Sequence, residues 1–74
     1  MEKLIAGNQG EGLWAATSRL FTFSKVHIVV RSKVETYDDV IALCGANFTV
    51  IALGGKEANL CQDCATRFAA LRTL

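Results

Sequence analysis

The chain has 74 residues, which is enough for one small domain and too few for a second hydrophobic core. Hydrophobic residues make up 51% of it, yet every apolar stretch is far shorter than the roughly 20 residues that a membrane span needs. Eight basic and seven acidic residues give a net charge of +1, which by itself does not indicate a surface that binds nucleic acid or membrane. The start of the sequence lacks the basic and apolar run of a signal peptide, so we expect a cytoplasmic protein.

The first segment is expected to be less ordered than the rest. Residues 1–12 hold three of the six glycines and show no periodicity, which predicts a flexible arm before a single domain over 13–74. The next segment, Leu13–Phe21, places its apolar residues on one side of a helical wheel and favours a short amphipathic helix. A strand that continues through Phe23 is the alternative, because β-forming residues follow without a break.

Three strands are predicted in the middle of the chain. Residues 25–31 form the clearest one, because apolar side chains alternate along one face and His27 lies on the other. A polar loop over 32–39 leads to a second strand over 40–44, and the two are expected to form a β-hairpin. A third strand over 47–53 ends at a pair of glycines.

The last segment is predicted to be helical. Asn59 suits the N-cap position, and Gln62 three residues later completes an approximate capping box. The apolar residues that follow recur at helical spacing, so one face of this helix is expected to pack on the sheet. The chain is therefore expected to be an α+β domain, with a short N-terminal helix, a three-stranded antiparallel sheet and a C-terminal helix.

The cysteines and the histidine indicate a metal site. Three cysteines cannot all pair in disulfides within one chain, which leaves free thiol, catalytic thiol or metal ligand as their roles. With the single histidine they provide four candidate ligands, the number that a closed structural zinc site uses. These candidates are His27, Cys44, Cys61 and Cys64.

Their spacing suits one ion. Two residues between Cys61 and Cys64 let both sulfurs reach the same metal, and the start of a helix stabilises thiolates there. His27 and Cys44 come together if their two strands pair in a suitable register. Gly45 fits a zinc knuckle, in which the chain turns tightly after the ligand. One structural Zn²⁺ in a treble-clef or zinc-ribbon-like arrangement is predicted, and it would supplement a marginal core.

Other roles for these residues remain open. Cysteine is often buried as a small hydrophobic residue, and a lone histidine in a strand is more often not a ligand. A Cys-x-x-Cys pair also occurs in redox proteins, but these need a βαβ framework and usually a nearby proline, which this chain lacks. A hydrolytic zinc site keeps one position open for water, whereas four protein ligands close it. We therefore expect neither an enzyme nor a small-molecule substrate.

The strings V-H-I-V, A-L-C-G and L-C-Q-D-C-A, in that order, resemble a family of short zinc-finger-like proteins common in actinobacteria and their bacteriophages. In that family a histidine-bearing strand, a Cys-Gly turn and a terminal Cys-x-x-Cys helix follow one another. The likeness covers residues 26–72, whereas residues 1–23 have no counterpart and the loop between histidine and first cysteine is longer here. It implies the same four zinc ligands, a phage or actinobacterial origin and, for a phage protein, a place in the host cytoplasm. It implies no activity.

An aromatic-rich segment before the zinc ligands predicts a surface that binds a protein. The partner would be a host protein whose activity is altered, or a second copy of the chain in a homodimer. The same side chains are equally expected to cover the protein's own sheet. The residues concerned are Trp14, Leu20, Phe21 and Phe23.

Nucleic-acid binding is the alternative function, since many zinc modules bind DNA or RNA. The candidate phosphate contacts are Lys56 at the glycine turn and Arg67 and Arg72 on the last helix. The acidic residues Glu57 and Asp63 lie close to them in sequence, and no arginine-rich stripe or set of stacking aromatic residues is present. Binding to a protein is therefore the preferred hypothesis.

Overall fold

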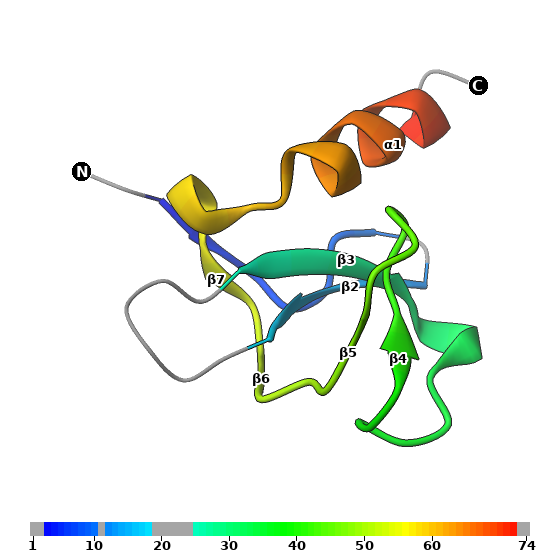
Figure 1. The fold of residues 1–74 in the computed structure, drawn as a ribbon. Coiled ribbons are helices and arrows are strands. Elements are labelled where there is room, and N and C mark those ends of the chain that lie inside the picture. The colour runs from blue at the N-terminus through cyan, green and yellow to red at the C-terminus, as the bar shows by residue number, and fades with distance from the viewer. Residues whose placement is uncertain (1–2, 11, 19–24, 73–74) are drawn as a thin grey trace.

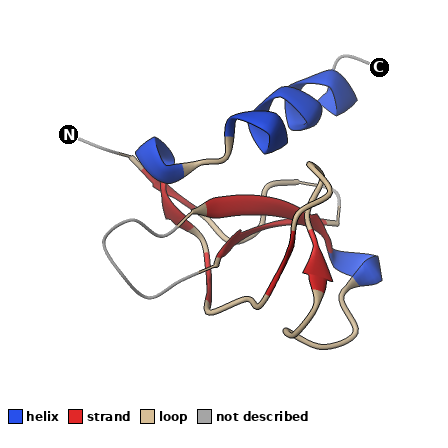
Figure 2. Ribbon diagram, in the orientation of Figure 1, coloured by secondary structure: helices blue, strands red, loops and turns tan. Residues whose placement is uncertain are grey.

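A computed structural model describes residues 3–10, 12–18 and 25–72 of the chain. It shows an α+β fold in which short antiparallel strands build the body and one helix lies along one side of it (Figure 1, Figure 2). The elements in chain order are β1 (Leu4–Ile5), β2 (Leu13–Thr17), β3 (Val26–Val30), the 3₁₀ helix η1 (Arg31–Lys33), β4 (Val40–Ile41), β5 (Asn47–Phe48), β6 (Ala52–Leu53), β7 (Gly55–Lys56), the 3₁₀ helix η2 (Glu57–Asn59) and α1 (Gln62–Arg72).

The central sheet has three strands in the order β3-β2-β6, and both pairings are antiparallel. The strand predicted over residues 25–31 is confirmed as β3, whose branched side chains suit a pleated and buried surface. In the middle strand, Ala15 and Ala16 are fully buried. Ala16 lies opposite His27, so its small side chain leaves space for the imidazole on that face of the sheet.

The predicted N-terminal helix is wrong where the structure describes it. Leu13–Thr17 is a strand that pairs along its whole length with β3, from Leu13 opposite Val30 to Thr17 opposite Val26. The strand alternative is confirmed for these five residues, and residues 19–24 lie outside the described part of the chain. A helical pattern over little more than two turns is a weak preference, and the ladder with β3 overrides it.

The segment expected to be a flexible arm contains β1, which pairs antiparallel with β7. Ile5 lies opposite Gly55 in this pair, although the two are far apart in sequence. Gly54, just before β7, has φ +83°, and a Cβ there would lie 2.6 Å from the carbonyl oxygen of Ile5. Glycine is needed at this position because it alone accepts both the left-handed conformation and so close a backbone.

The predicted antiparallel pairing of residues 25–31 with residues 40–44 is confirmed only in part, in the register that sets Cys44 opposite His27. β3 meets the second segment through one bridge, Val29 with Ala42, whereas β4 pairs with β5. The predicted third strand is divided accordingly, because its first part is β5 and its last part, β6, joins β2. The turn at Cys44 and Gly45 closes a much shorter loop than residues 32–39 would, which favours local pairing of β4 with β5.

The C-terminal helix is confirmed, but it begins later than predicted. Asn59 ends the 3₁₀ helix η2, and Cys61 is the residue that precedes α1. The backbone N–H of Ala65 donates to the carbonyl of Cys61 at 2.9 Å, which is the first hydrogen bond of the helix. The N–H of Cys61 itself donates to Val26 of β3 at 2.8 Å and so fixes the start of α1 against the central sheet.

The buried core is made of small and β-branched side chains, which limits how much apolar area it removes from water. Within the described ranges, no helix is long and apolar enough to cross a membrane. The core residues are Ala15, Ala16, Val26, Ile28, Val29, Val40, Ala42, Val50 and Cys64.

Candidate metal centre

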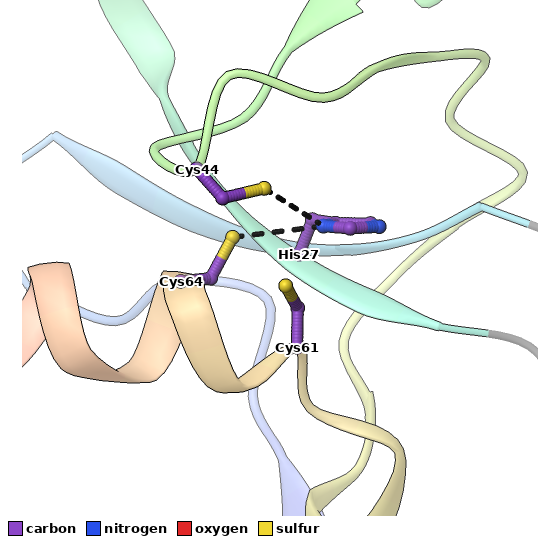
Figure 3. Close-up of side chains that lie close together, drawn as sticks. All are labelled: His27, Cys44, Cys61 and Cys64. Atoms are coloured by element: carbon purple, nitrogen blue, oxygen red, sulfur yellow. Dashed lines mark hydrogen bonds between the residues drawn. The ribbon is translucent and has the colours of Figure 1, made fainter.

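The four predicted ligands converge at one point between β3 and the start of α1 (Figure 3). Their ligand atoms all lie within 4.8 Å of one another. The Nδ1 atom of His27 is 3.7 Å from Sγ of Cys44 and 3.6 Å from Sγ of Cys64. The structure thus brings together His27, Cys44, Cys61 and Cys64, a group that can hold one metal ion.

The distances fit a tetrahedral zinc ion. With Zn–S of about 2.3 Å and Zn–N of about 2.0–2.1 Å, tetrahedral angles place the nitrogen about 3.6 Å from each sulfur. The 3.6 and 3.7 Å distances from Nδ1 of His27 agree with this value. Nδ1 is thus the nitrogen of His27 that faces the sulfurs of Cys44 and Cys64.

Three segments of the chain deliver the ligands. His27 is the second residue of β3, and Cys44 lies in the tight turn between β4 and β5. Gly45 follows with φ +90°, and its N–H donates to the carbonyl of Ala42 at 2.9 Å, as expected for a knuckle-like turn. The remaining pair comes from the start of α1, so that one ion would join a strand, a turn and a helix.

Cys61 occupies the N-cap position that the sequence analysis gave to Asn59. Burial raises the pKa of Cys61, but the backbone N–H groups of Cys64 and Asp63, with the thiols of Cys44 and Cys64, outweigh it. The net result is a lowered pKa, because a thiolate at a helix start accepts the unpaired N–H groups as a capping oxygen would. The start of the helix therefore stabilises the thiolate form of Cys61, which is the form that binds a cation.

Cys64 is fully buried and behaves differently. Burial raises the pKa of Cys64 to about 12; backbone N–H groups of Ile28 and Cys44 oppose this rise, and the neighbouring Cys44 side chain adds to it. A thiolate at this position needs a positive charge beside it, which a bound dication provides. Burial, with a smaller effect of the Lys25 charge, lowers the pKa of His27 and keeps the imidazole neutral, as a ligand must be.

One neighbour of the site was not singled out from the sequence. The ring of Phe48 lies against the imidazole of His27, with ring centroids 4.8 Å apart and planes inclined by 34°. The two residues are on strands that do not pair with each other, so no spacing in the sequence points to this contact.

The predicted protein-binding residues are only partly described. Trp14 is half-buried in β2, where Arg31 lies over its ring at 4.5 Å and Tyr37 meets it edge-on at 6.5 Å. Its indole therefore serves at least in part to cover the protein's own sheet. The other three residues of the set, Leu20, Phe21 and Phe23, lie outside the described ranges.

The predicted phosphate contacts are divided between β7 and α1. Lys56 is in β7, opposite Leu4 of β1, and Arg67 is exposed in the middle of α1. Arg72 is the last residue of α1, and five residues place it about 140° around the helix axis from Arg67.

Comparison with protein-family models, with curated proteins and with solved structures finds no significant match to this chain. The donor set and its geometry are therefore the evidence for a metal centre. The resemblance to short zinc-finger-like proteins stays a prediction.

Proposed function

We propose that this chain is a structural-zinc module that binds another protein. One Zn²⁺ would hold the fold together, and the folded domain would present the binding surface. One observation supports the metal site most directly. Nδ1 of His27 lies 3.7 Å from Sγ of Cys44 and 3.6 Å from Sγ of Cys64, which are the distances expected between ligands of a tetrahedral zinc ion. Three thiolates and one imidazole favour zinc among the common metals, because soft ligands and tetrahedral geometry suit it.

A structural role follows from the closed donor set. Four protein ligands complete the shell of zinc and leave no position for a water that would attack a substrate. The ligands come from a strand, a turn and a helix, so the ion would act as a cross-link between them. Such a cross-link suits a small core of alanine and valine side chains.

The protein-binding part is supported by large apolar side chains that remain in contact with water. Leu4 is 80% exposed and Ile41 is 63% exposed, in a domain whose core is otherwise small. If the chain has the phage origin that the motif resemblance implies, the partner would be a host protein; the other protein partner would be a second copy of this chain. The other large hydrophobic residues that are exposed are Tyr37, Ile51, Leu53 and Leu71.

Mass spectrometry tests the metal part first. Native spectra should show a mass about 63 Da above the denatured mass, because one zinc replaces two protons, and acid or chelator should remove the difference. The Cys61→Ala, Cys64→Ala double variant is the control and should show no excess mass. Equal native and denatured masses for a folded wild-type protein would exclude the zinc module.

The binding part needs the zinc-loaded protein. Light scattering over a range of concentrations tests self-association, and binding to a purified host protein, first isolated with the tagged chain, tests the other partner. Ile41→Asp should abolish the interaction and leave the zinc content unchanged, since Ile41 is exposed and is not a ligand. Binding of nucleic acid with a steep salt dependence, unaffected by Ile41→Asp, would replace this proposal with the nucleic-acid alternative.

A further inference from the structure

We infer that Phe48 is a positioning residue of the metal centre. Its ring contacts the imidazole of His27 and holds it in the orientation that directs Nδ1 toward the sulfurs. The inference rests on the proposed zinc site and adds to it a residue that binds no metal itself.

The contact between the two rings is direct. Their centroids are 4.8 Å apart and their planes are inclined by 34°, which is within the range of interacting aromatic pairs. Both side chains are half-buried, so the contact is partly shielded from water. The flat face of Phe48 therefore limits rotation of the imidazole about its last side-chain bond, a rotation that is otherwise broad.

Ring orientation matters more for Nδ1 than for a nitrogen at the tip of the ring. Nδ1 is next to the carbon that joins the ring to the chain, so a half-turn of the ring would carry it away from the sulfurs. Metal-binding histidines usually have this rotation fixed by a hydrogen bond from the other nitrogen to a carboxylate or carbonyl. Across residues 3–10, 12–18 and 25–72, the hydrogen bonds of the His27 ring are those of Nδ1 with Cys44 and Cys64. Within these ranges, the contact with Phe48 is therefore the one to which we assign the orienting role.

The fold connects this contact to a second ligand. Phe48 lies in β5 opposite Val40 of β4, and the turn between these strands carries Cys44. Val40 is 3% exposed, so the hairpin is anchored in the core by the residue that faces Phe48. The same hairpin thus supplies one sulfur to the ion and holds the imidazole that faces it.

The test is zinc affinity, measured by competition with a chromophoric chelator. Phe48→Ala should weaken binding about 10- to 100-fold, the usual effect of removing an orienting partner of a ligand. Phe48→Tyr, which keeps the flat ring, should bind like the wild type. Phe48→Leu keeps most of the apolar volume without the ring and should bind zinc more weakly than Phe48→Tyr. This variant keeps the test usable if Phe48→Ala fails to fold.

A double-mutant cycle separates positioning from general packing. His27→Cys replaces the imidazole with a thiolate that has no ring to orient, so Phe48→Leu should leave the zinc affinity of that variant unchanged. In the wild-type background, Phe48→Leu should also alter the absorption bands of bound Co²⁺, which report the nitrogen ligand. An equal loss of affinity in both backgrounds, or no loss in either, would overturn the role of Phe48. Absence of zinc from the wild type would instead overturn the metal site itself, so the two failures are distinguishable.

Discussion

Nδ1 of His27 lies 3.6 Å from Sγ of Cys64, although 37 positions separate the two residues in the sequence. One is on β3, an edge strand of the central sheet, and the other is in the first turn of α1. An ion between them would therefore hold the helix on the sheet directly. Removal of that ion leaves this junction to a fully buried thiol and a few hydrogen bonds.

Chelation of the metal is expected to unfold the domain. Structural zinc contributes about 10–16 kcal/mol of binding free energy, which exceeds the net stability of most small domains, about 5–15 kcal/mol. Circular dichroism before and after addition of a zinc chelator should show loss of the helix and sheet signals. Added Zn²⁺ should restore both, whereas Mg²⁺ should not. A spectrum and melting temperature that chelator leaves unchanged would contradict this prediction.

Cys64→Ser should be strongly destabilising. The hydroxyl keeps the approximate size of the side chain but removes a soft ligand and adds a polar group at a fully buried position. We expect a loss of about 4–5 kcal/mol or more, the range typical of a lost metal. Urea denaturation in the presence of zinc measures it. Thr66→Ala, an exposed change on the same helix, is the control and should stay within about 0.5 kcal/mol of wild type.

Zinc binding should weaken in acid. Burial and the charge of Lys25 lower the pKa of His27 from its usual 6.5, so the unfolded chain binds this proton more tightly than the fold does. The contribution of His27 to stability is then present above pH 6.5 and is lost as the pH falls through the lowered pKa. The three thiolates also bind protons as the pH falls, and this makes zinc release depend more steeply on pH. Zinc release followed with an indicator dye should rise below pH 6.5, and retention of zinc throughout this range would contradict the prediction.

Gly54→Ala should cost more stability than Gly12→Ala. The two glycines have similar φ, +83° and +75°, so an alanine pays a similar conformational cost at each. A Cβ at Gly54 would lie 2.6 Å from the carbonyl oxygen of Ile5, whereas a Cβ at Gly12 meets nothing within 4 Å. Because of this clash, we expect the free energy of unfolding of Gly54→Ala to be about 1–3 kcal/mol lower than that of Gly12→Ala. Urea denaturation of the zinc-loaded variants measures the difference. Equal losses for both variants would show that β1 moves aside freely.

The candidate ligands were predictable because residue type limits them. The chain has one histidine and three cysteines, and these are the residues that the structure brings together. The β3 strand was predictable as well, since its side chains alternate over a clear apolar run. Both inferences need only local sequence and the chemistry of zinc.

Other features depend on contacts between distant segments. The segment Leu13–Thr17 is a strand because β3 and β6 pair with it, which its short helix-like pattern does not reveal. The choice of Cys61 over Asn59 as N-cap depends on the site, where a thiolate serves as both cap and ligand. The contact of Phe48 with His27 depends on the register of β4 with β5, and register is weakly specified by a short strand.

The pairing of β1 with β7 also affects how the protein is made. As the chain is synthesised, Leu4 and Ile5 cannot pair until Lys56 and Gly55 have been made, and the candidate ligand group is complete only when Cys64 has left the ribosome. Hairpin β4–β5 can form earlier, but the long-range pairs cannot, because they require most of the chain. We therefore expect the nascent domain to complete its fold only after Cys64 has emerged, and a metal ion would be bound at that step.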